Sequence, residues 1–147
     1  MTEEQRTESA EFDAFNRRII AEFRANGGKV GGQFEGMSLA LLTTVGRKTG
    51  QRRTSPVAYM NVDGQPVVIA SKGGAPTHPA WFHNLVANPQ VTVEFGTDTF
   101  EATAEVLQGE KRDRIFAKVA AMAPGFGDYQ AGTTRVIPVV AIHRAGI

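Results

Sequence analysis

Four cationic side chains lie within seven residues of one another around a turn bounded by glycines. They are Arg47, Lys48, Arg52 and Arg53, and no acidic residue stands among them. A tight glycine turn can point backbone N–H groups at an anion, and guanidinium groups add charge and paired hydrogen bonds. Phosphate is therefore the natural ligand. Taken alone, the same residues fit a solvated, charged hairpin tip equally well.

The spacing around this turn differs from that of the common nucleotide-binding loops. A P-loop reads G-x-x-x-x-G-K-[ST] and opens a helix, whereas Gly46 is followed directly by Arg47 and strand-like segments flank the turn. The chain also has no G-x-G-x-x-G motif, so a Rossmann nucleotide site is unsupported.

Two further segments could meet a flat ligand. Residues 70–74 read ASKGG, in which paired glycines allow a close backbone approach and Lys72 can reach a phosphate or a ring carbonyl. Residues 79–85 carry the only tryptophan, Trp81, and the amide Asn84 on a predicted helix. The alternatives are an ordinary flexible loop at residues 70–74 and simple core packing of Trp81 in residues 79–85.

A fourth segment, residues 125–130, reads GFGDYQ and predicts a glycine loop that could cover a substrate. Its Tyr129 could donate a hydrogen bond to a developing oxyanion. A surface loop with one packed aromatic residue is the alternative.

Other catalytic chemistry is poorly represented. There is no cysteine, and His78 and His83 are five residues apart, whereas helical metal pairs are three or four apart. We therefore expect no metal site. No Ser–His–Asp set and no carboxylate pair stands out. This scarcity is typical of an enzyme whose cofactor carries the chemistry.

The composition indicates one domain with no strong overall electrostatic field. The 147 residues are 41% hydrophobic and 21% charged, with a net charge of +1, which argues against a nucleic-acid binder. The polar N-terminus predicts no signal peptide and a cytoplasmic location. A peripheral contact with the inner face of the membrane through the N-terminal helix is left open, as is the oligomeric state.

The elements that must position these residues follow from hydrophobic periodicity. Phe12, Phe15, Ile19 and Phe23 share one face of a helix predicted over residues 9–26. Residues 78–87, with Thr77 as N-cap, and residues 111–122 predict two more helices, and residues 123–134 read as irregular. Strands are predicted at residues 39–45, 53–62, 67–70, 91–95, 99–107 and 136–143.

The pattern predicts an α+β, mainly β fold without βαβ alternation. We expect an antiparallel split β-barrel of about six strands with about three flanking helices. We expect residues 1–26 to form an amphipathic helix within the single domain, and residues 27–147 to form the barrel.

These segments, in this order, resemble the deazaflavin-dependent nitroreductase family of actinobacteria. The matching text is LLTTVGRKTG at residues 41–50, Arg53, Pro56, ASKGG at 70–74, PAWFHNL at 79–85, ANP at 87–89, DYQ at 128–130 and RVIP at 135–138. The resemblance implies a split barrel of the FMN-binding type that binds reduced coenzyme F420, a 5-deazaflavin, and passes a hydride to a small electron-poor acceptor.

The resemblance also implies the site. The turn cations would hold the phosphate and glutamate tail, and Tyr129 would orient the acceptor. The positions it assigns to the coenzyme are Arg47, Lys48, Thr49, Arg53, Thr54, Ser55, Pro56, Val57, Ala58, Ile69, Ala70, Ser71, Lys72, Ala80, Trp81, Phe82, His83 and Asn84.

The sequence departs from nitro-drug-activating relatives at two positions. Phe126 stands where a tyrosine is found, and Gly132 stands where a large aromatic residue sits. Quinones, enones and lactones are therefore the expected acceptors rather than nitroimidazoles. The alternatives are an FMN-dependent reductase on a similar barrel and a non-catalytic protein that binds a coenzyme or lipid.

Overall fold

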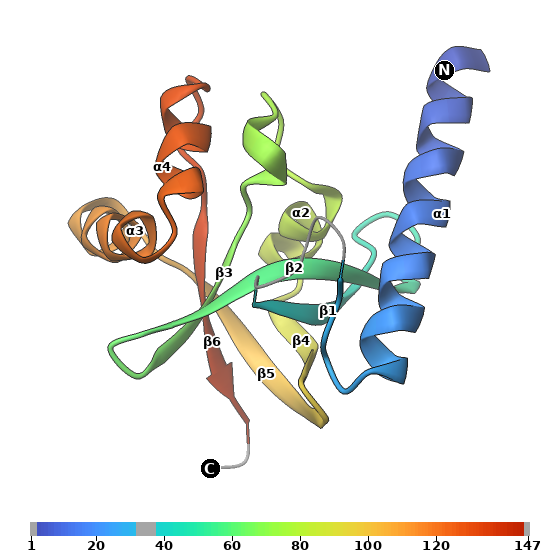
Figure 1. Cartoon of the computed structure of the whole chain (residues 1–147), viewed down its shortest axis with the longest axis horizontal. Coiled ribbons are helices and arrows are strands. Elements are labelled where there is room, and N and C mark those ends of the chain that lie inside the picture. The colour runs from blue at the N-terminus through green and yellow to red at the C-terminus, as the bar shows by residue number, and fades with distance from the viewer. Residues whose placement is uncertain (1–2, 32–37, 146–147) are drawn as a thin grey trace.

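Six antiparallel strands close into a barrel in the order β1-β2-β3-β6-β5-β4 (Figure 1). The computed structural model describes residues 3–31 and 38–145, with the side chains of the first helix from residue 14 onward. The strands are β1 (Leu39–Val45), β2 (Arg52–Val62), β3 (Gln65–Ile69), β4 (Gln90–Phe95), β5 (Asp98–Val106) and β6 (Val139–Arg144). The predicted barrel of six antiparallel strands is confirmed.

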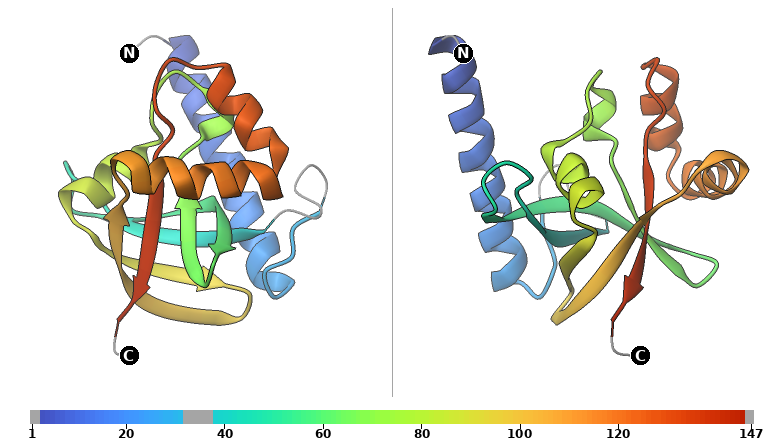
Figure 2. Two further views of the ribbon diagram at one scale, coloured as in Figure 1. Left: turned by 90° about the vertical axis from the view of Figure 1, so that its left-hand side faces the viewer. Right: turned by 180° about the vertical axis from the view of Figure 1, so that it is seen from behind.

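Four α-helices accompany the barrel in the described part of the chain. They are α1 (Glu3–Ala25), α2 (Ala80–Ala87), α3 (Gly109–Met122) and α4 (Pro124–Ala131), with a 3₁₀ turn, η2 (Lys72–Gly74). The views in Figure 2 show α1 along one side of the barrel and α3 across another. The turn η2 and helix α4 stand together at the end of the barrel toward which the N-terminus of α1 points.

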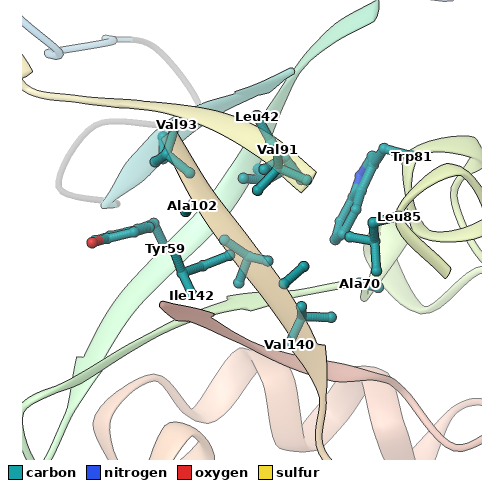
Figure 3. Packing of buried hydrophobic residues seen from close by; sticks show 14 residues of the cluster. Leu42, Tyr59, Ala70, Trp81, Leu85, Val91, Val93, Ala102, Val140 and Ile142 are labelled. Carbon is teal, nitrogen blue, oxygen red and sulfur yellow. The ribbon is translucent and has the colours of Figure 1, made fainter. Parts of the chain in front are cut away.

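The barrel interior is apolar and α2 closes one of its ends. Alternate residues of every strand, among them Leu42, Val57 and Val140, are buried in one cluster with Trp81 and Leu85 of α2. Figure 3 shows the side chains of Trp81 and Leu85 extending from α2 toward the strands. Burial of these large side chains holds α2 against the end of the barrel, since apolar area removed from water is the main favourable term in folding.

Two further clusters attach the outer helices. Ile19 and Phe23 of α1 pack with Leu41 on the outer face of β1, so these described apolar residues of α1 face the barrel. Ile115, Phe116 and Val119 of α3 pack on the outer face of β3 and β6. No described helix has both the length and the apolar character that a membrane crossing requires.

Strands β1, β2 and β3 form an antiparallel meander, with a register that follows from its turns. Leu39 lies opposite Ala58 across β1 and β2, and Ala58 lies opposite Ile69 across β2 and β3. The two-residue turn at Asp63 and Gly64 has φ of 53° and 84°. Both values are positive, as a hairpin turn that matches strand twist requires.

The prediction of an irregular segment at residues 123–134 is wrong, because Pro124–Ala131 forms α4. Proline and two glycines disfavour a helix interior, but Pro124 occupies the first turn, where it is tolerated, and Phe126 is buried against α3. Tertiary packing therefore outweighs local propensity.

Several element boundaries also differ from the predictions. Helix α1 starts at Glu3 rather than at residue 9, and β6 starts at Val139 rather than at residue 136. Helix α2 begins at Ala80 with Pro79 at its N-cap, so the prediction of Thr77 as the cap is wrong. The Thr77 hydroxyl instead accepts a hydrogen bond from Lys72 Nζ at 3.3 Å.

Candidate functional site

A pocket of about 290 Å³ lies between the β1–β2 turn and helix α2. Its lining residues are Gly46, Arg47, Lys48, Thr49, Arg53, Ala80, His83 and Asn84. The turn and the helix are about thirty residues apart in the chain. The structure therefore brings together two segments that the sequence indicated separately.

The turn itself is held by its own hydrogen bonds. Gly46 N–H donates to Gln51 O at 2.7 Å, and Gly50 N–H donates to Gly46 O at 2.8 Å. A Cβ on Gly46 would lie 2.6 Å from Thr49 Oγ1 and 3.2 Å from Gln51 O, so a larger residue here would displace the Thr49 side chain. Within the described residues, the N–H groups of Lys48 and Thr49 have no partner. They remain available to an anion.

Asn84 clamps the turn to α2. Its Oδ1 accepts a hydrogen bond from Arg47 N–H at 3.1 Å, and its Nδ2 donates to Thr44 Oγ1 at 3.2 Å. Asn84 and Thr44 are both buried. Because both ends of the amide are engaged, Asn84 builds the pocket wall and sets the distance between the turn and the helix.

The pocket carries positive charge that no described acidic residue neutralises. Arg47, Lys48 and Arg53 are exposed at the pocket and form no ion pair in the part of the chain that the structure describes. The neighbouring Arg52 differs, since adjacent strand residues point to opposite faces. Arg52 Nη2 donates to Thr92 Oγ1 at 2.9 Å. Three of the four cations therefore converge, and Arg52 lies on the other face of β2.

The five coenzyme positions predicted at residues 54–58 lie on two opposite faces of β2. Val57 faces the barrel interior and Ala58 packs on the outer side against α3. By alternation Ser55 shares the inner face, whereas Thr54 and Pro56 share the outer face. Thr54 Oγ1 lies 2.7 Å from Thr43 Oγ1, with either hydroxyl as donor.

One edge of β2 is open beside this run. Residues 52–57 pair with β1 alone, and pairing with β3 begins at Ala58. Tyr59 N–H points toward the β1 side, where it donates to Ser38 O at 3.1 Å. Since backbone groups alternate along a strand, those of Thr54 and Pro56 point to the open edge, with no backbone partner among the described residues. Such an edge can hydrogen-bond a heterocycle.

The Ser71 loop, residues 70–78, and Tyr129 lie against each other. Gly74 has φ of +81°, and a Cβ there would be 3.4 Å from Tyr129 Cα. Ser71 is buried, Lys72 is exposed with φ of 47°, and Tyr129 is 38% exposed. The predicted lid loop is in fact helix α4, which presents Tyr129 beside residues 71–74. A positive φ at a non-glycine residue is a strained conformation that is enriched at functional sites.

Four other predicted positions are buried or packed rather than open. Ile69 belongs to the outer core under α3, and Ala70 and Trp81 belong to the barrel interior. Phe82 packs partly against that interior, with its ring 4.8 Å from that of His78. These side chains hold the walls of the site in place.

Histidine rings connect the pocket to the Ser71 loop. His83, a pocket residue, lies 5.8 Å from His78 between ring centroids. His78 Nδ1 accepts a hydrogen bond from Arg135 Nη1 at 3.0 Å, and Arg135 Nη2 donates to Ser71 O at 2.6 Å. Arginine has only donors, so neutral His78 carries its proton on Nε2.

The ionisation of His78 should make folding stability depend on pH. Burial, followed by the Arg135 and His83 charges, lowers the pKa of His78 below 6.5. The unfolded chain then binds more protons in mild acid than the folded chain does. The stability that neutral His78 contributes is therefore present above pH 6.5 and is lost as the pH falls below that value. We expect His78→Gln, which keeps an acceptor for Arg135, to lose less thermal stability between neutral and mildly acidic solution than the unmodified chain. An equal loss in both proteins would contradict this assignment.

One buried arginine, Arg112, and one half-buried arginine, Arg135, escaped the sequence reasoning. Arg112 is 9% exposed, and its Nε and Nη2 donate to Ile137 O at 3.1 and 2.7 Å. Its position three residues before Ile115 and four before Phe116 puts it on the buried face of α3, a signal that could have revealed it. Arg135 offered no such signal, because its partners lie near residues 70–78, far away in sequence.

The chain is similar to known proteins in both sequence and fold. The family model described as F420H(2)-dependent quinone reductase matches residues 15–144, from within α1 to the end of β6. A protein of Mycobacterium tuberculosis named F420H(2)-dependent quinone reductase is 38% identical over 128 residues, which cover 84% of this chain and 86% of that protein.

Two solved structures are also similar. One, described as an F420-H2 dependent reductase, is 36% identical with a TM-score of 0.65, covering 72% of this chain and 94% of that chain. Another, described only as a domain-swapped dimer, is 32% identical with a TM-score of 0.66, covering 93% of this chain and 98% of that chain. By family model, sequence identity and barrel architecture, the chain belongs to the F420H(2)-dependent quinone reductase family.

Proposed function

We propose that this protein binds reduced coenzyme F420 with its phosphate and anionic tail at the pocket between the β1–β2 turn and α2, and reduces quinones with it. The observation that carries the proposal is the pocket lined by Arg47, Lys48 and Arg53 without a described acidic partner. Open N–H groups at Lys48 and Thr49 add further donors for an anion.

The residues present fit the chemical groups of the coenzyme. The cationic pocket suits a phosphodiester and glutamate carboxylates. The open edge of β2, with the Thr54 and Pro56 backbone groups, suits the polar edge of a deazaflavin ring. Ser71 and Lys72 would border the ring on the side where Tyr129 stands. Bound coenzyme would supply a hydride.

The contribution of the protein is to orient the acceptor and stabilise charge. Tyr129 is 38% exposed, and its phenol would donate a hydrogen bond to the acceptor oxygen on which negative charge develops. The rest of the rate gain would come from alignment of two flat molecules in a site with buried walls. Solvent would complete the protonation.

The proposal includes enones and lactones as further classes of acceptor, in addition to quinones. Phe126, which replaces a tyrosine of the nitro-drug-activating relatives, is 7% exposed and packs in the core beneath α4. Gly132 follows α4 as its C-cap and offers no side chain. The α4 side of the site therefore presents one aromatic hydroxyl, Tyr129, which favours oxygen acceptors over bulky nitroimidazoles.

A stopped-flow assay tests the function directly. Reduced coenzyme F420 is mixed with the protein and a short-chain naphthoquinone, and we expect coenzyme oxidation well above the rate without protein. An enone and a lactone, assayed in parallel, test the finer classes. No oxidation above background, with tight coenzyme binding, would instead indicate a non-catalytic binding protein. Tighter fluorescence titration with FMN than with coenzyme F420 would overturn the cofactor assignment.

Lys72 allows its charge to be separated from its backbone conformation. Lys72→Ala removes the ammonium group and keeps a Cβ at the positive φ of 47°, as lysine does, whereas Lys72→Gly removes the ammonium group and also relieves the backbone strain. We expect Lys72→Ala to weaken coenzyme binding by roughly threefold, as the loss of one exposed charge contact implies. Isothermal titration measures the change. Unchanged affinity in Lys72→Ala would remove Lys72 from the coenzyme site.

A further inference from the structure

Arg135 joins the two sides of the site through its guanidinium. It makes four hydrogen bonds, from Nε to Ala75 O at 2.7 Å, from Nη1 to Ala70 O at 3.1 Å and to His78 Nδ1 at 3.0 Å, and from Nη2 to Ser71 O at 2.6 Å. These acceptors are spread over the Ser71 loop, residues 70–78. No acidic residue in the described ranges pairs with Arg135.

The backbone of Arg135 is held from the opposite direction by α4. Gln130 Nε2 donates to Arg135 O at 2.8 Å, and Gln130 Oε1 accepts from Ile137 N–H at 2.9 Å. The same oxygen accepts from Arg112 Nη2 at 2.8 Å, which ties this arrangement to α3. Gln130 is the next residue after Tyr129, so the segment that carries Arg135 is fixed to the helix that presents Tyr129.

A second contact joins the same two parts. Gly74 of the Ser71 loop packs on the backbone of Tyr129, close enough that an added Cβ would lie 3.4 Å from Tyr129 Cα and O. This packing contact includes no hydrogen bond, and the backbone bond from Ala70 N–H to Pro138 O, at 3.0 Å, holds only the start of the loop. The four bonds of Arg135 hold the rest of it, because they restrain three carbonyls and one ring at once.

We propose that Arg135 is a positioning residue for the reduction: it holds the Ser71 loop, on the coenzyme side, at a fixed place relative to α4, on the acceptor side. This rests on the proposed function, in which Ser71 and Lys72 border the deazaflavin and Tyr129 contacts the acceptor. Misplacement of reacting groups by about 1 Å can lower a rate up to about a hundredfold, so a brace between the two sides affects turnover more than coenzyme affinity.

The chemistry of the side chain explains why arginine is needed. A guanidinium has five donors in a rigid plane, and four of them are used here. Lysine keeps the charge but offers one nitrogen, which cannot span acceptors on both sides of the loop. Arg135→Lys therefore separates the geometry of the fork from its charge.

The kinetic test compares Arg135→Lys and Arg135→Ala with Arg114→Lys, an exposed arginine on α3 that makes no hydrogen bond or ion pair within the described residues. We expect both Arg135 variants to lose about tenfold in kcat with a quinone and to raise its KM, with the coenzyme Kd changed by less than about threefold. Arg114→Lys should match the unmodified protein. A lower Tm with unchanged kcat and KM would mean that Arg135 only stabilises the fold, and would overturn the proposal.

A second measurement uses the protein without coenzyme or acceptor. Amide hydrogen exchange should rise in residues 70–78 of Arg135→Lys, while strands β4 and β5 keep the exchange rates of the unmodified protein. Equal exchange in residues 70–78 of both proteins would overturn the proposal, even where the kinetics change. Absence of turnover in the unmodified protein would sink the proposed function alone, because the exchange experiment still decides whether Arg135 holds the loop.

Discussion

Arg53→Ala is expected to weaken binding of coenzyme F420 about tenfold, and Arg47→Ala with Arg53→Ala about a hundredfold, as charge-assisted bonds of about 1.4 kcal/mol each imply. Both side chains line the pocket beside the β1–β2 turn and have no described acidic partner. Their charge is therefore free to act on a ligand. Fluorescence titration at two salt concentrations measures the affinity, and the salt dependence should be smaller in the double variant.

The chain supplies a matched control one residue away. Arg52→Ala removes the same charge from the same strand, but Arg52 bonds Thr92 on the opposite face of β2. We expect this variant to bind the coenzyme within about twofold of the unmodified protein, because exposed charges interact weakly at that separation. Equal losses in Arg52→Ala and Arg53→Ala would show that only the net charge matters, and that no phosphate site lies at the turn.

The same variants test whether different residues bind the coenzyme and select the acceptor. Arg53 lies at the turn, whereas Tyr129 stands beside Gly74 on α4. Replacing Arg53 should therefore leave the order of preference among quinones unchanged at saturating coenzyme. A changed order with unchanged coenzyme affinity would place Arg53 at the acceptor instead.

Asn84→Asp should weaken coenzyme binding by about thirtyfold, since it places a carboxylate in the pocket and removes a donor. The two side chains have nearly the same shape, so α2 keeps its packing. Asn84 Nδ2 donates to Thr44 Oγ1 at 3.2 Å, a bond that a carboxylate oxygen can replace only by accepting the hydroxyl proton. The new charge lies among Arg47, Lys48 and Arg53 and competes with the coenzyme for them.

Asn88→Asp provides the control for this substitution. Asn88 follows the last residue of α2, one helical turn beyond Asn84, and does not line the pocket. It adds the same charge and should change coenzyme affinity by less than about twofold. If Asn84→Asp bound the coenzyme as well as Asn88→Asp does, the anion would have to bind elsewhere.

The sequence by itself determined the features that depend on neighbouring residues. The apolar run of β1, the Asp63–Gly64 hairpin and the alternation in β4 each follow from local propensity and period, and the structure agrees closely with all three. The cations of the β1–β2 turn were visible for the same reason, because a turn gathers residues that are already close along the chain. The ordered motifs at residues 41–50, 70–74 and 79–85 also indicated the family, which the comparisons confirm.

Only the tertiary structure decided which side of each element meets the site. Alternation predicts that Arg52 and Arg53 diverge, but closure of the barrel and the position of α2 select Arg53 for the pocket. Trp81 turns toward the barrel interior because α2 closes the end of the barrel. Helix α4 forms, despite its proline and glycines, because Phe126 gains burial against α3.

Arg135 is the clearest case of information that lies outside local sequence. Three of its four acceptors are backbone carbonyls of the Ser71 loop, about sixty residues away, and a carbonyl is the same in every residue. Apart from His78, no residue type at positions 70–78 therefore marks a partner. The sequence supplied a flexible, charged side chain. The fold placed it where three carbonyls and one histidine converge, and these acceptors require hydrogen-bond donors.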